Sequence, residues 1–425
     1  MDILVVGGGG REHAIIWSLA KSPKADKIYC APGNAGIAQL AECVPIQVNE
    51  FEKLADFATE KKVGLVVIGP DDPLADGIVD VFEKHQIPVY GPRKNAALIE
   101  GSKTFMKDLL HKYNIPTAAY AKFDDYESAL TYLQQQSTPI VIKADGLAAG
   151  KGVTVAHDMD EAIDALQSIM QDKVFGEAGS KVVIEEFLAG QEMSILAFVD
   201  GETVRPMPAA QDHKPAYDND LGPNTGGMGT YSPLPHIKQS IIDQAIETII
   251  VPTAKAMVAE GRSFSGVLFA GLMISPDGTP KTIEFNARFG DPETQVVLPR
   301  LESDLLEIFL ATVNGTLADI EIKWSEEAAV CVILASGGYP AAYAKGLPIS
   351  GLQHTDEQAL VFHAGTAQGQ NGEVVTNGGR VLGVVGLGAN IASARTKAYE
   401  QAAKITFEGK HQRSDIAAKA LFKIN

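Results

Sequence analysis

The chain has 425 residues, which is too long for a single hydrophobic core, so we expect roughly two to four domains. Its formal net charge of −17 argues against a nucleic-acid partner, because nucleic-acid binding needs a basic surface. A hydrophobic content of 45% is typical of a soluble globular protein, and no apolar run approaches the length of a membrane span.

The three cysteines, Cys30, Cys43 and Cys331, are scattered and lack the spacing of a metal site. They are more typical of small core residues in a reducing compartment than of nucleophiles. Met1 leads directly into an apolar strand, without the pattern of a signal peptide. We therefore expect a cytoplasmic protein that has no membrane partner.

Strand and helix patterns alternate through the first part of the chain. Residues 2–6 predict a buried strand, residues 7–10 a glycine turn and residues 11–21 a helix. Further strands are expected at 28–31, 63–69 and 88–91, and further helices at 51–62 and 73–86. This order predicts a parallel, Rossmann-like α/β sheet, which we take as a first domain of residues 1–102.

The glycine turn at residues 7–10 is similar to a dinucleotide-binding loop, but two features of that fingerprint are missing. Glu12 or His13 stands in place of its third glycine, and the second strand ends at Pro32 without a carboxylate for a ribose. Backbone N–H groups at a helix start still make an anion site, which suits a phosphate monoester on a substrate. A tight turn without a ligand is the alternative.

The middle of the chain predicts a small α+β unit, at about residues 120–190, that can move as a lid. Ser102 is expected to cap a helix that runs to Tyr113, ahead of this unit. Within the unit, an apolar strand at 139–143 ends in Lys143 and precedes a glycine-rich loop at 144–152. A strand at 153–156, a helix at 159–171 and a strand at 181–187 follow.

Charged residues around this unit suggest a nucleotide site. Lys143 and Lys103 are candidate cations for phosphates, because the glycines of the neighbouring loop let the backbone close over such groups. The strand end near Glu185 offers backbone groups for an adenine edge, and Glu192 can reach ribose hydroxyls. Each of these residues, taken alone, also fits a solvated surface position.

A second polar, glycine-rich stretch covers residues 210–229, and such a loop inside a domain often carries function. Asp212 offers a carboxylate for an amine, Lys214 a cation for an anion, and residues 226–229 offer backbone N–H groups. His213 is more often a hydrogen-bonded loop residue than a catalyst. No serine or cysteine nucleophile elbow is near, so covalent catalysis is not expected.

The most informative stretch is residues 282–295, where Glu284, Asn286 and Arg288 alternate with apolar residues. Alternate residues of a strand share one face, so these three side chains are expected to project together. Carboxylate and amide oxygens are the ligands that Mg²⁺ prefers, and arginine neutralises phosphate. The pattern predicts a site for a metal ion and a triphosphate. Beyond residue 326 only an apolar strand at 328–335 and a glycine-rich, strand-like segment at 371–390 stand out.

Together these motifs resemble those of the ATP-grasp carboxylate–amine ligases, and more narrowly of the phosphoribosylamine–glycine ligase family. The resemblance spans essentially the whole chain, and its most specific marks are residues 222–229 and the Arg-Phe-Gly-Asp-Pro-Glu segment at 288–293. Further marks lie at residues 5–14, 32–36, 143–152 and 211–214.

The resemblance implies a multidomain α/β fold, with an N-terminal Rossmann-like domain, a central ATP-grasp domain at 103–325 and a small mixed α/β domain at 326–425. It implies that the protein uses ATP and Mg²⁺ or Mn²⁺ to join glycine to 5-phosphoribosylamine, the second step of purine biosynthesis. The products would be glycinamide ribonucleotide, ADP and phosphate, with a glycyl phosphate intermediate. The expected assembly is a monomer or a weak homo-oligomer.

The resemblance also implies roles for particular residues. Arg288 and Lys143 would be catalytic, and Glu284 and Asn286 would bind the metal. Residues that would hold ATP are Lys103, Lys143, Gly146, Gly150, Lys151, Gly152, Glu185, Glu186, Leu188 and Glu192. Residues that would hold glycine and phosphoribosylamine are Gly8, Gly9, Gly10, Arg11, Asn34, Asp212, Lys214, Thr225, Gly226, Gly227 and Met228.

The sequence departs from the family pattern in three places. Pro215 stands where a basic residue is expected, and Asp72 is an extra acid on the substrate side. The strand at 269–273 supplies no acidic metal ligand, so Glu284 would bridge two metals or the site would be leaner. Two other functions stay open: another ATP-grasp enzyme of purine synthesis, and a non-catalytic nucleotide-binding or dinucleotide-dependent protein.

Overall fold

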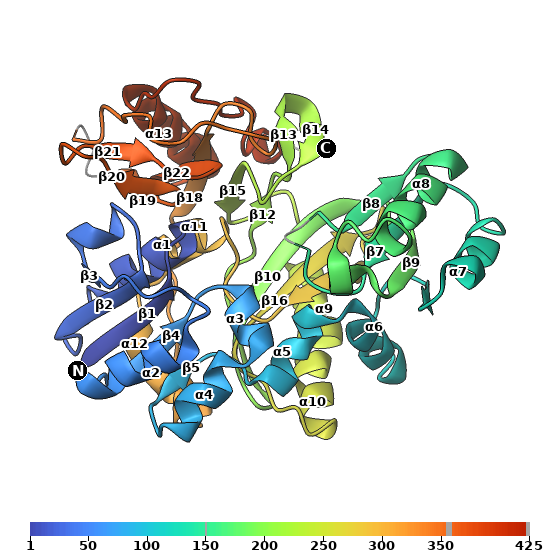
Figure 1. The fold of residues 1–425 in the computed structure, drawn as a ribbon, viewed down its shortest axis with the longest axis horizontal. Coiled ribbons are helices and arrows are strands. Elements are labelled where there is room, and N and C mark those ends of the chain that lie inside the picture. The colour runs from blue at the N-terminus through green and yellow to red at the C-terminus, as the bar shows by residue number, and fades with distance from the viewer. Residues whose placement is uncertain (149–150, 354–358, 422–425) are drawn as a thin grey trace.

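The computed structural model describes residues 1–148, 151–353 and 359–421. Its N-terminal region is a parallel sheet in the order β3-β2-β1-β4-β5, so the predicted Rossmann-like arrangement is confirmed (Figure 1). The strands are β1 Asp2–Gly7, β2 Lys27–Pro32, β3 Glu42–Cys43, β4 Leu65–Ile68 and β5 Val89–Tyr90. The helices α1 Gly10–Leu19 and α2 Phe51–Glu60 connect them, close to their predicted ranges.

The helical stretch predicted at 73–86 is confirmed, but the chain divides it into two helices, α3 Asp71–Asp76 and α4 Ile78–Lys84. Gly77, between them, has a φ of 97°, which belongs to the left-handed region that ends helices. Two short elements gave no clear sequence signal, namely β3 and the helix α5 Lys94–Gly101. Ser102 caps α6 Lys103–Lys112 as predicted, since its hydroxyl accepts the Phe105 N–H at 3.1 Å.

The predicted α+β unit is a four-stranded antiparallel sheet in the order β6-β9-β7-β8. Its elements are β6 Tyr120–Phe123, α7 Tyr126–Leu133, β7 Ile140–Ala144, β8 Val153–Ala156, α8 Met159–Met170 and β9 Val182–Glu186. The unit has a hydrophobic core of its own and projects to the right of the molecule in Figure 1. Separate cores allow one unit to move against another.

A second antiparallel sheet, in the order β11-β10-β16-β17, lies at the centre. Its strands are β10 Gln191–Asp200, β11 Thr203–Pro206, β16 Ser265–Ile274 and β17 Pro280–Asn286. The helical run from α9 Gln239–Ala245 through a π-helical turn to α10 Val251–Ala259, and the helices α11 Thr294–Val297 and α12 Leu305–Val313, complete this part.

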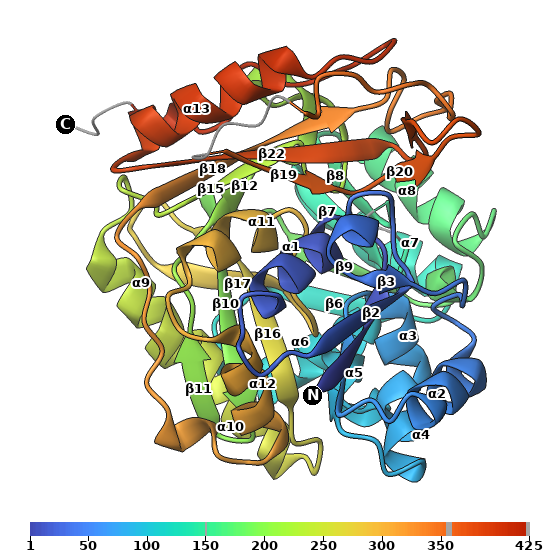
Figure 2. The ribbon, with the colours of Figure 1, turned by 90° about the vertical axis from the view of Figure 1, so that its left-hand side faces the viewer.

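A third sheet joins distant parts of the chain in the order β12-β15-β18-β22-β19. Its strands are β12 Gln211–Asp212, β15 Gly229–Ser232, β18 Ala328–Ala335, β19 Ala359–His363 and β22 Arg380–Gly388. The helix α13 Ile391–Lys404 covers β18 and β22 (Figure 2). Two small hairpins complete the fold: β13 Pro215–Tyr217 with β14 Leu221–Asn224, and β20 Thr366–Gln368 with β21 Val374–Thr376.

The N-terminal, central and C-terminal sheets share one hydrophobic core. A single cluster of buried side chains includes Leu4 of β1, Ile195 of β10 and Val330 of β18. These three regions therefore form one body, against which the unit at β6–β9 is packed.

Candidate active site

Strand β17 carries the predicted metal and phosphate residues to its end. Phe285 is buried, whereas Glu284 and Asn286 are half-buried, so the predicted alternation is confirmed within the strand. Ile283 has no partner on β16, because the register shifts there by one residue. Such a β-bulge increases the local twist and re-aims the side chains beside it. The strand stops at Asn286, and Arg288 lies just beyond it.

Arg288 connects the strand end to the N-terminal region. Its Nη2 atom lies 3.0 Å from the Glu100 carboxylate and donates to Asn286 Oδ1 at 3.2 Å. The Glu100 carboxylate also accepts the Ala287 N–H at 2.7 Å. Burial raises the pKa of Glu100 to about 7, although Arg288 opposes the rise. Within the described residues, Arg288 Nε is buried and has no hydrogen-bond partner. An anion is the natural partner for this donor.

A buried cluster of charges joins the β6–β9 unit to the central sheet. The Glu185 carboxylate lies 3.0 Å from Lys143 Nζ and 2.9 Å from Lys107 Nζ. Lys143 Nζ also donates to the Ile283 carbonyl at the bulge, at 3.2 Å. Burial lowers the pKa of Lys103, and the nearby Lys143 lowers it further, whereas Glu284 opposes the change. The predicted phosphate lysines and the predicted metal carboxylate are therefore neighbours.

Sequence reasoning missed Lys107. It lies one helical turn after Lys103 on α6, and residues four apart share a helix face. That spacing was the available signal. Burial lowers the pKa of Lys107 to about 8, in spite of the opposing charge of Glu185.

The other described residues that were predicted to hold ATP do not form one network of contacts with this cluster, and each has its own position. Lys103 Nζ donates to the Gly146 carbonyl at 3.2 Å, so the lysine and the glycine loop are close. Glu186 points the other way from Glu185, and its carboxylate accepts the Ala119 N–H at 3.0 Å. Leu188 is half-buried after β9, and Gly152 is buried. Gly150 lies outside the described residues.

Glu192 and Lys214 were predicted at separate subsites, but the structure brings them together. Lys214 Nζ lies 2.6 Å from Glu192 Oε2 and 2.9 Å from Asp212 Oδ1. Glu293 is buried nearby; burial raises its pKa to about 7, and the Asp212 charge adds to the rise. Glu293 ends the Arg-Phe-Gly-Asp-Pro-Glu segment, but the sequence alone suggested no role for it. Its position shows that acids outnumber cations in this part of the site.

The N-terminal glycine turn packs against the Arg-Phe-Gly-Asp-Pro-Glu segment. Gly9 caps α1, and its N–H donates to Glu12 at 2.7 Å. Glu12 also holds Arg11 at 2.6 Å, and Arg11 Nη1 donates to the Phe289 carbonyl at 3.2 Å. Gly8 approaches the Gly33 backbone so closely that an added Cβ would lie 2.6 Å from its carbonyl oxygen. Only glycine fits at that point.

Asn34 shapes the second loop at this site with its side chain. Its amide nitrogen donates to the Gly8 and His363 carbonyls at 2.9 and 2.8 Å. Its amide oxygen accepts the N–H groups of Gly36 and Ile37, both at 2.9 Å. The side chain is therefore fully engaged in structural hydrogen bonds that hold the loop in place.

A cavity of about 360 Å³ opens where the glycine turn, the Asp291 segment and the C-terminal sheet meet. Gly8, Gly9, Asn34, Asp291, Tyr339 and Arg380 are among its lining residues. Arg380 Nη1 lies 3.3 Å from Asp291 Oδ1 and donates to the Gly226 carbonyl at 2.8 Å. Sequence reasoning missed Arg380 and Tyr339, because nothing local in the C-terminal region marks them.

A second cavity, of about 390 Å³, lies beside the first and shares Tyr339 with it. Lys151 of the glycine loop, Thr225 and Gly226 also line it. The Thr225 hydroxyl donates to the Lys214 carbonyl at 2.7 Å and accepts the Gly227 N–H at 3.0 Å. Gly227 has a φ of 116°, and Met228 and Gly10 are buried. The two predicted substrate loops thus line two neighbouring cavities that share Tyr339.

The part of the chain that the structure describes contains no group of three or more His, Cys, Asp or Glu side chains arranged to hold a metal ion. Glu284 and Asn286 supply only one such acid, so they fall below that count, and their role as metal ligands stays a prediction. In the same residues, no helix has both the length and the apolar character needed to cross a membrane.

A family model described as an ATP-grasp (A) domain matches residues 101–294, so this part of the chain belongs to the ATP-grasp class. A crystal structure of biotin carboxylase from Campylobacter jejuni, in complex with an ATP analogue, superposes with a TM-score of 0.75 over 97% of this chain and 92% of that one. Its sequence identity is 12%, so this likeness concerns the fold alone.

The chain belongs to the phosphoribosylglycinamide synthetase family. Models of the family's N, ATP-grasp and C domains match residues 1–100, 101–294 and 329–419. Phosphoribosylamine–glycine ligase of Caldanaerobacter subterraneus subsp. tengcongensis is 52% identical over 98% of this chain and all of its own length. The crystal structure of phosphoribosylamine–glycine ligase from Thermotoga maritima has a TM-score of 0.84 and 38% identity, covering 98% of this chain and 100% of that one.

Proposed function

We propose that this protein is an ATP-dependent ligase that joins glycine to 5-phosphoribosylamine and releases glycinamide ribonucleotide, ADP and phosphate. The observation that carries the proposal is the meeting of Lys103, Lys143, Glu284 and Arg288 at one strand end, in a chain of this family. Cations and oxygen ligands at one place suit the transfer of a phosphoryl group.

The residues at the end of β17 fit a divalent ion. Glu284 and Asn286 offer a carboxylate and an amide oxygen, which are ligands that Mg²⁺ and Mn²⁺ accept. Mg²⁺ commonly uses one or two protein carboxylates and completes its shell with phosphate oxygens and water. When bound, the ion would neutralise charge on the phosphates. We propose Mg²⁺ or Mn²⁺ here, held by Glu284 and Asn286.

In the proposed mechanism, the lysines hold the phosphates of ATP while the glycine carboxylate attacks the γ-phosphorus. The P–O bond to ADP breaks, and the product is glycyl phosphate, in which the carboxylate oxygen has become part of a leaving group. Arg288 donates to the transferred group through its buried Nε, which has no hydrogen-bond partner among the described residues. The β6–β9 unit closes and keeps water from the acyl phosphate.

The second step is attack by the amine of phosphoribosylamine on the acyl carbon, with release of phosphate. The buried carboxylates of Glu293 and Asp212 lie in the region of the proposed substrate loops and suit ammonium groups. The cavity at the glycine turn is lined by Arg380 and by Gly8 and Gly9 of the turn, and it suits the ribose phosphate.

The test offers phosphoribosylamine and ATP-Mg²⁺ with each amino acid in turn and measures ADP. We expect glycine-dependent ADP release with glycinamide ribonucleotide as the product. ADP release that needs no glycine, or that needs bicarbonate or formate instead, would contradict the proposal and favour another ATP-grasp reaction. Fluorescence-detected NADH binding without ATP turnover would favour a dinucleotide-dependent protein.

Several finer expectations stay predictions. The division into residues 1–102, 103–325 and 326–425, the assignment of Glu185, Glu186, Leu188 and Glu192 to the adenosine, and a monomeric or weakly associating state belong to this group. The cytoplasmic location inferred from the three free cysteines also belongs to it.

A further inference from the structure

The hairpin β13–β14 has little stability of its own and lies between residues that are proposed to bind substrate. It spans residues 215–224, directly between Asp212 and Lys214 on one side and Thr225 on the other. Its second strand is exposed along its whole length. Two strands alone are marginally stable in water, so the hairpin needs support from outside.

The tip of this hairpin is also unfavourable by itself. Asn219 and Asp220 have φ values of 60° and 56°, in the left-handed region that side chains other than glycine rarely adopt. Asparagine and aspartate tolerate this conformation better than most residues, but it still needs stabilising contacts. The structure supplies these from a segment almost two hundred residues further along the chain.

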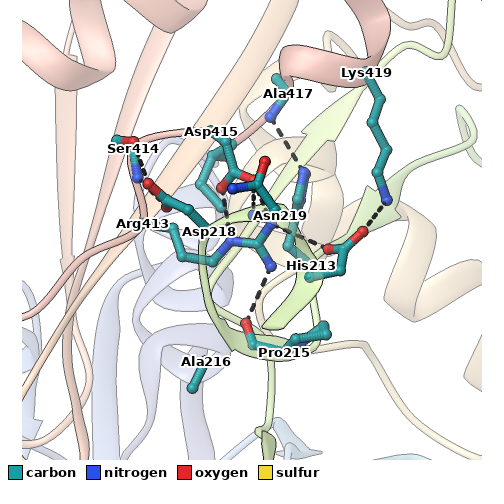
Figure 3. A network of polar contacts seen from close by, with 12 residues as sticks. His213, Pro215, Ala216, Asp218, Asn219, Arg413, Ser414, Asp415, Ala417 and Lys419 are labelled. Carbon is teal, nitrogen blue, oxygen red and sulfur yellow. Dashed lines mark hydrogen bonds and ion pairs between the residues drawn. The ribbon is translucent and has the colours of Figure 1, made fainter. Parts of the chain in front are cut away.

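That segment is residues 411–419, which we call the C-terminal clamp (Figure 3). Arg413 is fully buried at its centre. Its guanidinium donates to the Pro215 carbonyl at 3.1 Å and to Asp220 at 3.1 Å, and it forms two bonds of 2.8 Å with Asp415. One side chain thus holds the first strand of the hairpin and its tip.

The neighbours of Arg413 hold the hairpin tip. Asp218 accepts the Ser414 N–H at 2.7 Å and also pairs with the Ser414 hydroxyl. Asp415 accepts the Asn219 N–H at 2.8 Å, at one of the two left-handed residues. Lys419 Nζ lies 2.6 Å from Asp220, which gives this carboxylate a second cation.

Two side chains of helix α13 stabilise the clamp through hydrogen bonds. Arg395 donates to the Ile416 and Ser414 carbonyls at 2.8 and 2.6 Å. The Tyr399 hydroxyl donates to the Arg413 carbonyl at 2.8 Å and accepts the Ile416 N–H at 3.1 Å. Since α13 packs on β18 and β22, the clamp is fixed to the C-terminal sheet.

The base of the hairpin connects the clamp to the proposed substrate residues. The Lys214 carbonyl accepts both the Thr225 N–H, at 2.8 Å, and the Thr225 hydroxyl. The Ala417 N–H of the clamp donates to Nε2 of His213, at 3.4 Å. His213 lies between Asp212 and Lys214 in the chain, so the clamp contacts both the tip and the base.

We propose that Arg413 and its clamp are positioning elements for substrate binding: they fix the hairpin at residues 215–224 and thereby hold Asp212, Lys214 and Thr225 in place for glycine and phosphoribosylamine. The proposal rests on the proposed function for the identity of these substrates. It assigns the C-terminal segment a role in substrate affinity, although the clamp itself lines neither cavity described above.

The test uses Arg413→Gln in the full chain. We expect KM for glycine and for phosphoribosylamine to rise by about 10-fold, because a displacement near 1 Å in a supporting loop is costly. KM for ATP should rise less than either of these values, because among the described residues no hydrogen bond or ion pair joins the clamp to Lys103, Lys107 or Lys143. Hydrogen exchange should show faster exchange for amides of residues 215–224 than in the wild type.

Milder variants keep the test decisive if Arg413→Gln does not fold. Asp218→Asn and Ser414→Ala each remove part of an exposed contact, and both should give the same pattern with smaller changes. Arg413→Lys keeps the charge but not the fork, so its KM values should lie between those of the wild type and Arg413→Gln. Arg205→Gln is the matched control. Arg205 lies on the edge strand β11, away from the hairpin, and its guanidinium donates to the Ala318 carbonyl.

Two results would overturn the proposal. One is unchanged exchange at residues 215–224 in every clamp variant that folds. The other is an equal rise in all three KM values, which would mean a general loss of structure. A wild-type enzyme that ignores glycine would refute the proposed function instead, while the exchange result would still report on the clamp.

Discussion

Replacement of Glu185 by glutamine tests the buried charge cluster most directly. The Glu185 side chain is 4% exposed, and it lies between Lys107 and Lys143, which are 0% and 5% exposed. Glutamine keeps the size of the side chain but removes the only negative charge that contacts both ammonium groups among the described residues. Breaking a buried ion pair by removing one partner costs about 3–5 kcal/mol. If the protein unfolds as one unit, such a loss lowers Tm by roughly 5 °C.

The pH dependence of this loss has a definite sign. Burial already lowers the pKa of Lys107 to about 8, and the loss of Glu185 lowers it further. A lysine whose pKa is lowered in the folded state costs stability while it is charged, and the cost disappears as it loses its proton. The difference in unfolding free energy between the variant and the wild type should therefore be largest at low pH, shrink as the pH rises toward 8, and stay constant above the wild-type pKa of Lys107.

The assay combines thermal or urea unfolding at several pH values with KM for ATP. Because Lys143 loses its fixed partner, KM for ATP should rise more than KM for glycine. Glu186→Gln is the stability control, since this residue follows Glu185 in β9 but its side chain is 45% exposed and pairs with Lys281 at the surface. Such a pair contributes about 0–1 kcal/mol. The reasoning fails if Glu185→Gln unfolds no more easily than Glu186→Gln, or if its effect grows with pH.

Three further predictions concern the site. Glu284→Gln should abolish ADP release with a small change in Tm; a melt lowered by many degrees would instead mean a structural role. Arg380→Gln should weaken inhibition by ribose 5-phosphate about tenfold, because a charged hydrogen bond is lost, and should leave KM for ATP unchanged. Glu293→Gln should be more stable relative to the wild type at pH 8 than at pH 5. Burial raises the pKa of this acid to about 7, so its charged form costs folding energy only at the higher pH, and equal differences at both pH values would contradict this.

Local patterns in the sequence were sufficient wherever one short segment determines the chemistry. The alternation around Glu284 and Asn286 fixed a strand face, and Ser102 fixed a helix start. The two helices at Asp71–Lys84 were predicted as one, because Gly77 inside an amphipathic pattern does not reveal its left-handed φ. The strand β3 has only two residues, too few for a periodic signal.

Long-range pairing could not be predicted from the same patterns. Arg380 meets Asp291 because β15, from the middle of the chain, pairs with β18, which in turn pairs with β22. No motif near Arg380 in the sequence indicates that its side chain contacts Asp291 or lies near the glycine turn. Arg413 is a similar case: a lone arginine near the end of a chain usually suggests a solvated charge, and only the fold shows that it is buried among carboxylates.

The shared sheet gives a physical reason for a C-terminal region in this enzyme. The residues proposed for phosphate transfer lie on α6, β7 and β17 and just beyond β17, whereas the cavity at the glycine turn takes Tyr339 and Arg380 from beyond residue 326. Under the proposed function the two tasks are separate: the central sheet and the β6–β9 unit would bind ATP, and the C-terminal sheet would complete the walls around the second substrate. Because β12 and β15 belong to that C-terminal sheet, Asp212 is on the same sheet as Arg380 and not in the β6–β9 unit. Closure of the unit would then bring activated glycine toward an amine site that stays in place.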